Sequence, residues 1–132
     1  MLIEESYTIA VLIPCYNEES TISDVVLKFK EVLPNSKIYV YDNNSTDNTY
    51  TLAKESGAIV RKEEYQGKGN VIRRMFADIE ADIYLIVDGD MTYDPSAAQP
   101  MINKLINNNL DMVLCARSEV SNSAYRMGHK LG

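Results

Sequence analysis

The sequence predicts an α/β domain, an α/β/α sandwich in which helices cover both faces of a mostly parallel sheet. Short apolar runs of strand length alternate along the chain with segments whose apolar residues recur at helical spacing. Clusters of glycine, proline and asparagine separate these segments. Strands that alternate with helices in this way pair in parallel through right-handed crossovers. At 132 residues, the chain is long enough for one domain with a real core.

Five strands are predicted from apolar, β-branched runs. Pro14 closes the first of them, because proline has no N–H group to continue the ladder. The run from Ile83 to Val87 carries no charge, which is typical of a strand buried on both sides of a parallel sheet. We therefore expect it to be the central strand. The predicted strands are residues 8–14, 37–41, 58–61, 83–87 and 111–116.

Four helices are predicted between these strands. The first runs over about residues 21–33, and Thr21 with Asp24 predicts a capping box at its start. The third follows a flexible loop at residues 66–70, and the fourth lies within residues 95–108 with Pro100 in its first turn. The apolar residues expected to face the core from the third and fourth helices are Val71, Ile72, Met75, Phe76, Ile79, Met101, Ile102, Leu105 and Ile106.

Asp88-Gly89-Asp90 follows directly on the apolar run at residues 83–87. Glycine lets the backbone turn sharply, so the two carboxylates can project together at the carboxyl end of the strand. Such anions repel each other unless a cation lies between them. Hard oxygen ligands suit Mg²⁺ or Mn²⁺, with positions left for phosphate oxygens. The alternative for so short a motif is a solvated turn in which the aspartates cap the backbone.

Further polar clusters follow the other predicted strands, so we expect them to meet at one edge of the sheet, where ligands bind in such folds. Asp42 can accept hydrogen bonds from a base or a ribose, or can be a turn residue. Lys68, between two glycines, can approach a phosphate or lie in a surface loop. Arg117 can clamp a diphosphate or be a surface cation. The clusters are residues 16–18, 42–45 and 88–90, and Arg117.

Composition and motifs exclude several classes of protein. The formal net charge of −6 argues against nucleic-acid binding, which needs a basic surface. No apolar run reaches the length of a membrane span, and Glu4 and Glu5 replace the basic start of a signal peptide, so a cytoplasmic segment is expected. Cys15 and Cys115 are expected to be reduced, and His129 to lie at the surface. P-loop and dinucleotide-binding glycine motifs are absent from the sequence.

Five short motifs stand in an order and spacing that resemble one enzyme family. Together they extend from about Thr8 to Arg117. The match resembles the inverting family 2 glycosyltransferases of the Rossmann-like GT-A fold, on the branch of the dolichyl- and polyprenyl-phosphate sugar synthases. The motifs are I-P-C-Y-N-E-E (residues 13–19), Y-D-N-N-S-T-D-N-T (41–49), G-A-I-V (57–60), Q-G-K-G-N (66–70) and V-D-G-D-M-T-Y-D-P (87–95).

The resemblance implies a role for each matching residue. Asp88 and Asp90 would be the D-x-D pair that binds Mg²⁺ or Mn²⁺, with Asp90 the more direct ligand and Asp88 reaching the ribose, the sugar or the metal. Asp42 would hold the base. Asp88, Asp90 and Arg117 are the implied catalytic residues, with Arg117 facing the diphosphate. The residues implied to bind the nucleotide sugar are Pro14, Tyr16, Asn17, Glu18, Asp42, Lys68, Gly69 and Asp88.

The implied reaction moves a hexosyl group from a UDP- or GDP-linked donor with inversion. The leaving diphosphate gains negative charge, which a divalent cation and Arg117 would stabilise. An alcohol acceptor would need a general base, and the sequence offers no convincing one. A polyprenyl or dolichyl phosphate is already anionic, so we expect this lipid phosphate as the acceptor. The full-length protein would then work at the cytoplasmic face of the membrane.

Relatives of this family continue beyond the point where this sequence stops, with an acceptor-binding segment. We therefore expect residues 1–132 to be the donor part of a GT-A domain, truncated at its C-terminus. A missing segment would expose a sheet edge and favour a homo-oligomer. Two alternatives stay open: a donor-binding module without transfer activity, and a nucleotidyltransferase. The second would need a glycine-rich, basic loop after the first strand, which residues 14–18 do not supply.

Overall fold

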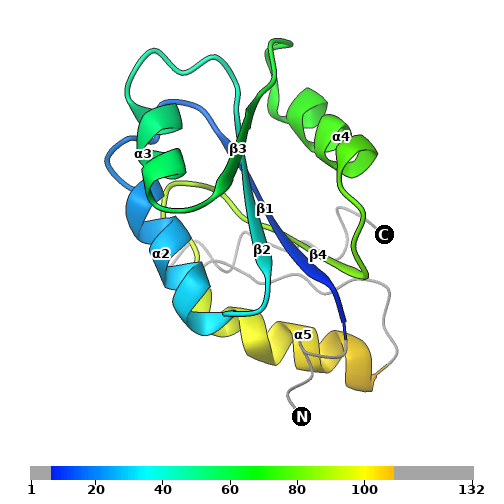
Figure 1. Cartoon of the computed structure of the whole chain (residues 1–132). Coiled ribbons are helices and arrows are strands. Elements are labelled where there is room, and N and C mark those ends of the chain that lie inside the picture. The colour runs from blue at the N-terminus through cyan, green and yellow to red at the C-terminus, as the bar shows by residue number, and fades with distance from the viewer. Residues whose placement is uncertain (1–6, 109–132) are drawn as a thin grey trace, which may run out of the picture.

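The computed structural model describes residues 7–108, which form a four-stranded parallel sheet with helices on both faces (Figure 1). This confirms the predicted α/β class and the parallel pairing. The strands are β1 (Ile9–Cys15), β2 (Lys37–Asp42), β3 (Ile59–Lys62) and β4 (Ile83–Ile86). The helices are α2 (Ile22–Val32), α3 (Thr49–Glu55), α4 (Lys68–Asp78), the 3-10 helix η1 (Pro95–Ala97) and α5 (Ala98–Asn107). The predicted strand at 111–116, Cys115, Arg117 and His129 lie outside the described residues.

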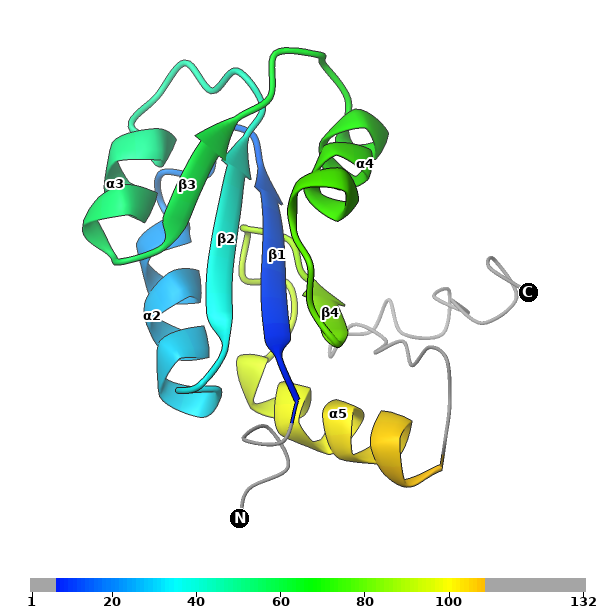
Figure 2. The ribbon, with the colours of Figure 1, turned by 45° about the vertical axis from the view of Figure 1, so that its right-hand side comes forward.

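Strand β1 lies in the interior of the sheet, whose order is β3-β2-β1-β4. Successive residues of a strand face opposite sides, so β1 contributes to two separate apolar cores. Val11 and Ile13 belong to the core that contains α2, whereas Ala10 and Leu12 pack with Met75 of α4. Figure 2 shows α2 and α3 on one side of the strands and α4 on the other. Every residue of β1 is buried, which makes it the strand on which both layers rest.

Within the described residues, β4 is not the central strand, buried on both faces, that the sequence predicts. It pairs with β1 alone and lies at the edge of the described sheet. Ile83 is buried, but Tyr84 and Leu85 are half-buried and Ile86 is 40% exposed. An uncharged, apolar run predicts a strand, but it does not predict the position of that strand in the sheet. Strand order depends on pairing partners that lie far away in the sequence.

One helix start, one helix cap and one apolar position also differ from the predictions. Helix α4 begins at Lys68, so its first turn replaces the expected flexible loop. Thr21 precedes α2, but its hydroxyl makes no capping hydrogen bond and donates to the backbone oxygen of Gly89 instead. Phe76 is 47% exposed and packs edge-to-face on Tyr84. The apolar face of α4 is therefore narrower than predicted.

Helix α5 lies at the end of the sheet where β1 begins (Figures 1 and 2). Pro100 is in the first turn of α5, where its missing N–H group has no intrahelical partner to lose. Ile102 is buried, and Leu105 and Ile106 pack against the core on the α2 side, as predicted. Across residues 7–108, no helix is both long and apolar enough to cross a bilayer.

Candidate functional site

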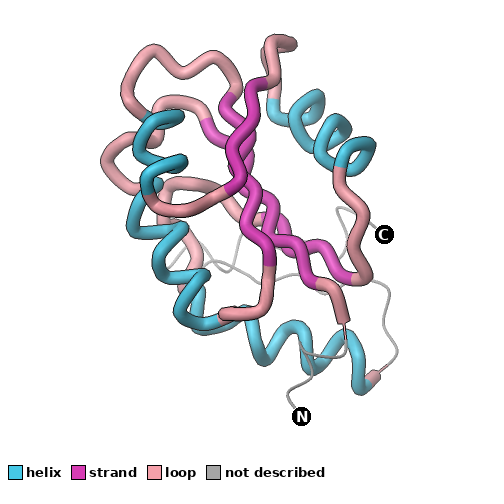
Figure 3. The backbone as a smooth tube through the Cα atoms, viewed as in Figure 1, coloured by secondary structure: helices cyan, strands magenta, loops and turns pink. Residues whose placement is uncertain are grey.

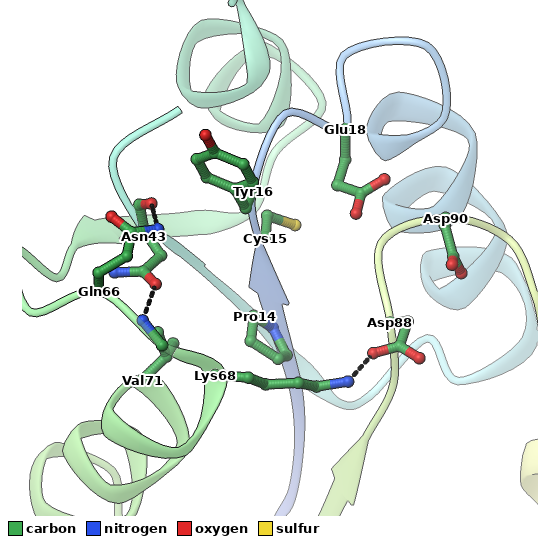
Figure 4. Close-up of a pocket in the computed structure, with 11 residues that line it drawn as sticks. Pro14, Cys15, Tyr16, Glu18, Asn43, Gln66, Lys68, Val71, Asp88 and Asp90 are labelled. Atoms are coloured by element: carbon green, nitrogen blue, oxygen red, sulfur yellow. Dashed lines mark hydrogen bonds and ion pairs between the residues drawn. The ribbon is translucent and has the colours of Figure 1, made fainter. Parts of the chain in front are cut away.

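A pocket of ≈ 430 Å³ opens beyond the carboxyl ends of β1, β2 and β4. The loops that follow β1 and β2 lie at this same end of the sheet (Figure 3). It is the edge at which the sequence places the ligand, because parallel strands bring their carboxyl ends together. The lining residues are Pro14, Cys15, Tyr16, Glu18, Asn43, Gln66, Gly67, Lys68, Val71, Asp88 and Asp90 (Figure 4).

The Asp88-Gly89-Asp90 turn is packed tightly against the end of β1 and the start of α2. A Cβ atom added to Gly89 would lie 2.6 Å from Sγ of Cys15 and 3.4 Å from Cδ1 of Ile22. Only glycine fits there without displacement of its neighbours. The hydroxyl of Thr21 donates to the Gly89 carbonyl and fixes the turn from the other side. Close packing of the glycine therefore decides where the flanking aspartates project.

Three carboxylates gather on one side of the pocket: Glu18, Asp88 and Asp90, which we call the acidic end (Figure 4). The pKa of Glu18 is raised above its usual value, mainly because burial disfavours its charged form and further because Asp90 and Asp88 repel it. Asp90 is oriented by its own turn, in which its Oδ1 accepts from the backbone N–H of Thr92 at 3.0 Å. Negative charge is therefore concentrated where the fold leaves room for a ligand.

Lys68 faces the acidic end from the opposite side of the pocket. It is the first residue of α4, and its Nζ forms an ion pair with Oδ1 of Asp88 (Figure 4). Among the described residues that line the pocket, it is the only basic one. Its side chain is 55% exposed, against 23% for that of Asp88. The pair therefore spans the pocket at a level that water can reach.

Asn43 organises the other end of the pocket; the sequence placed it in the polar cluster at residues 42–45 but did not predict it as a site residue. It is 4% exposed, and its Nδ2 donates to the backbone oxygens of Glu63 and Tyr65, each at 2.8 Å. Its Oδ1 accepts from the Gly67 N–H at 2.8 Å, and its own N–H donates to the Cys15 carbonyl at 2.8 Å. We call Asn43, Gln66 and Gly67 the amide end. One buried amide thus ties the loop before α4 to the ends of β1 and β2.

The loop after β1 is held in place by hydrogen bonds to the loop after β2. Asn17 has a left-handed backbone, with φ of 52°, which asparagine tolerates better than most residues. Its N–H donates to Oγ of Ser45 at 2.8 Å, and its Oδ1 accepts from the N–H of Thr46 at 2.8 Å. The N–H of Glu18 donates to the Thr49 hydroxyl at 2.8 Å. These bonds fix the backbone between Tyr16 and Glu18, which both line the pocket.

The predicted site residues divide into three groups by their positions. Asn17, Asp42 and Gly69 do not line the pocket. Asp42 is 2% exposed, and its Oδ1 accepts from the N–H of Ser45 at 3.3 Å, which corresponds to the turn alternative. Arg117 lies outside the described residues. The predicted residues that do line the pocket are Pro14, Tyr16, Glu18, Lys68, Asp88 and Asp90.

Cys15, Asn43, Gln66, Gly67 and Val71 line the pocket without having been predicted as site residues. Each lies within two residues of a predicted site residue, so proximity along the chain was the available signal. Cys15 is 3% exposed, and burial raises the pKa of its thiol above the usual value. It is therefore a neutral wall of the pocket and not a reactive thiolate.

The acidic end fits a divalent cation only when another ligand completes the coordination. Within residues 7–108, no three His, Cys, Asp or Glu side chains are placed to hold a metal by themselves. Asp88 and Asp90 nevertheless both present hard carboxylate oxygens to the pocket. Mg²⁺ in particular is usually bound by one or two carboxylates together with waters and the phosphates of a substrate. The residues present thus suit a cation that arrives with a phosphate-bearing ligand.

Comparison with known proteins identifies close relatives. The glycosyl transferase family 2 model matches residues 10–132. Protein RfbJ of Shigella flexneri is 54% identical over 126 residues, which cover 95% of this chain and 98% of RfbJ. The dolichol-phosphate mannosyltransferase of Pyrococcus furiosus is 25% identical over 116 residues, which cover 83% of this chain and 33% of that enzyme.

Solved structures agree with these sequence matches. Glucosyl-3-phosphoglycerate synthase from Mycobacterium tuberculosis, in complex with Mn²⁺, uridine diphosphate and glucosyl-3-phosphoglycerate, has a TM-score of 0.66 and 28% identity. The match covers 82% of this chain and 41% of the synthase. The same synthase has also been solved with Mg²⁺ and uridine diphosphate. The chain thus spans nearly all of RfbJ but less than half of the other two proteins.

Proposed function

The chain belongs to glycosyl transferase family 2 and has the GT-A fold, and from that membership we propose that it binds a nucleotide-diphosphate sugar for inverting transfer to a polyprenyl or dolichyl phosphate. The observation that carries this proposal is the division of the pocket into two chemically different ends. Tyr16 and the amide end offer an aromatic ring and amides. The acidic end and Lys68 offer charges suited to a cation and a diphosphate.

The donor would lie along the pocket with its base towards the amide end. Tyr16 is 50% exposed, so its ring is accessible to a base that stacks on it. The diphosphate would then lie between Lys68 and the two aspartates. Lys68 would donate hydrogen bonds to a phosphate oxygen, which neutralises part of the charge of the leaving group. This arrangement uses three of the charged residues that line the pocket, Lys68, Asp88 and Asp90.

Metal use is part of the proposal, because the related synthase was solved with Mn²⁺ and with Mg²⁺. An ion of this kind, held by Asp88 and Asp90, would supply electrostatic stabilisation to the departing diphosphate. The chain's own contribution is to fix the turn that carries both carboxylates through Gly89 and Thr21. Arg117, which follows the last predicted strand in the sequence, is proposed to face the same diphosphate.

The lipid-phosphate acceptor is supported by the mannosyltransferase from Pyrococcus furiosus, whose name states that it acts on dolichol phosphate. A phosphate acceptor is anionic near neutral pH and needs positioning more than deprotonation. No base candidate is apparent in the sequence, which favours such an acceptor over an alcohol. Use of a lipid acceptor would bring the chain to the cytoplasmic surface of a membrane.

A panel of nucleotide sugars tests donor binding first. We expect one of the UDP-, GDP- or dTDP-linked sugars to raise the melting temperature in the presence of Mn²⁺, because a ligand that binds only the folded state stabilises it. Asp90→Asn should remove most of the Mn²⁺-dependent part of the shift. No shift with any nucleotide sugar, with or without Mn²⁺, would contradict the proposed function.

A second candidate function is donor binding without transfer by these 132 residues alone. It is favoured by the fact that they correspond to only 33% and 41% of the length of two relatives. Incubation with the selected donor, Mn²⁺ and a polyprenyl phosphate separates the two functions. Appearance of a glycosylated lipid phosphate supports the transferase, whereas binding with no lipid product supports the donor-binding module.

A further inference from the structure

We propose that Lys68 is a displaceable counter-ion, which occupies Asp88 in the ligand-free protein and moves to the donor diphosphate when cation and nucleotide bind together. The inference rests on the proposed function, because it concerns the same pocket. Lys68 would thus have two alternative partners: the Asp88 carboxylate, which it contacts in this structure, and a phosphate of the donor. Its consequence is that the fold itself couples cation binding to nucleotide binding.

The first argument is the geometry of the ion pair. Lys68 Nζ contacts Oδ1 of Asp88, so the ammonium group covers an oxygen that a divalent cation would use. Figure 4 shows the lysine side chain extended across the pocket from α4 to the turn after β4. The backbone from which it projects is held in place, because the Gly67 N–H donates to buried Asn43. The side chain can therefore change partner while its anchor stays fixed.

The second argument is the balance of charge. Glu18, Asp88 and Asp90 line one side of the pocket, and Lys68 is the single basic residue among its described lining residues. Without a counter-charge, these carboxylates repel each other at the edge of the apolar core. Because the described residues supply no three metal-ligating side chains in one place, a cation alone is weakly held. The lysine is thus the counter-charge that the protein itself supplies in the absence of ligand.

The third argument is that the pair is strong enough to form but weak enough to be displaced. The Lys68 side chain is 55% exposed, and exposed ion pairs contribute little net free energy. An incoming diphosphate brings two or more negative charges, so the ammonium group gains a more highly charged partner. When Lys68 leaves, the Oδ1 atom of Asp88 becomes available to the cation. Each ligand therefore raises the affinity for the other, a coupling that must be reciprocal at equilibrium.

Mn²⁺ titrations of the full 132-residue chain test this inference, with free Mn²⁺ measured by electron paramagnetic resonance. In the absence of nucleotide, Lys68→Met should bind Mn²⁺ about three- to fivefold more tightly than the wild type, the upper part of the range expected for loss of a partly exposed ion pair. It should bind UDP or GDP with Mn²⁺ more weakly, as measured by calorimetry. Lys68→Arg should retain the wild-type pattern, because it keeps the charge.

Arg73→Met is the matched control, because it removes one positive charge from an exposed position on the same helix outside the pocket lining. It should leave both affinities within about twofold of the wild type. Unchanged Mn²⁺ affinity in Lys68→Met, with nucleotide binding intact in the wild type, would overturn the counter-ion proposal alone. Failure of every variant and of the wild type to bind Mn²⁺ and nucleotide would overturn it together with the proposed function.

Discussion

The amide end and the acidic end of the pocket differ in how much of their polar chemistry the protein satisfies by itself. At the amide end, both Nδ2 hydrogens and Oδ1 of buried Asn43 are paired with backbone groups at 2.8 Å. At the acidic end, burial and the nearby carboxylates of Asp90 and Asp88 together raise the pKa of Glu18. Folding therefore completes the first region, whereas the second carries a charge imbalance that a ligand can relieve.

The two ends of the pocket therefore have different properties: the amide end is rigid, and the acidic end can bind a cation. A buried amide with all its partners made holds a loop in a single position, because leaving any of them unpaired is costly. Carboxylates that repel each other destabilise the empty site and are stabilised by a cation. We expect substitutions at the amide end to act on stability first, and substitutions at the acidic end to act on binding first.

Asn43→Asp should have the largest effect, a loss of about 3 kcal/mol in unfolding free energy, because a carboxylate would face the carbonyls of Glu63 and Tyr65 in place of a donor. Chemical denaturation measures it. Asn44→Asp is the control: Asn44 is exposed and its Nδ2 donates only to acceptors at the surface, so a change under about 1 kcal/mol is expected. Equal losses in both variants would contradict the special role of Asn43.

Gly89→Ala should cost about 1–3 kcal/mol of unfolding free energy, because the new Cβ would lie 2.6 Å from Sγ of Cys15. Nucleotide-sugar binding should fall more steeply than stability, since both aspartates move with the turn. Gly69→Ala is matched to it, because no heavy atom lies within 4 Å of a Cβ built there and alanine suits a helix better. A stable Gly89→Ala variant with unchanged binding would show that the turn tolerates displacement.

Glu18→Gln should stabilise the ligand-free protein and weaken cation binding. Removal of the charge relieves repulsion from Asp90 and Asp88, so the melting temperature at pH 7 should rise by about 1–4 °C. Differential scanning calorimetry without metal measures the rise, and Mn²⁺ titration measures the loss. A fall in melting temperature would mean that Glu18 makes a favourable contact outweighing the repulsion.

The stabilisation of Glu18→Gln over the wild type should also depend on pH. Because the pKa of folded Glu18 is raised above 4.5, the folded state binds its proton more tightly than the unfolded state. Ionisation of Glu18 therefore lowers stability as pH rises from about 4.5 through the raised pKa. The difference in melting temperature between Glu18→Gln and the wild type should be full at pH 7 and should vanish near pH 4. If the difference in melting temperature does not change with pH, the stabilisation comes from packing of the new side chain and not from loss of the charge.

Much of the fold could be predicted because the chain repeats a simple pattern. Apolar runs such as residues 9–13 and helical periodicity such as that of residues 22–29 predicted the strands and helices, and their alternation predicted parallel pairing. Residues that follow strands were predicted to share one rim, and Tyr16, Glu18 and Asp88 do line one pocket there. Local pattern suffices for these features because the spacing of apolar residues in strands and in helices can be read from the sequence.

The remaining features depend on contacts between segments distant in sequence. The position of β4 at the edge of the described sheet follows from its pairing with β1 alone. Asn43 is buried because carbonyls some twenty residues away lie around it, and the sequence gives it the same polar character as exposed Asn44. Thr21 contacts Gly89 across 68 residues, which no capping pattern could indicate.

The sequence by itself determined the α/β alternation, the family and the rim on which a ligand would lie, because these depend on periodicity and on short motifs. Only the tertiary structure decided which polar residues form hydrogen bonds between the loops of the rim and which face the pocket. The physical reason is that hydrogen-bond satisfaction and charge repulsion depend on distance in space. Asn17 is therefore bonded to the loop after β2, and Asp42 accepts from Ser45 in the turn that directly follows it. Lys68 and Asp88, in contrast, form an ion pair across the pocket.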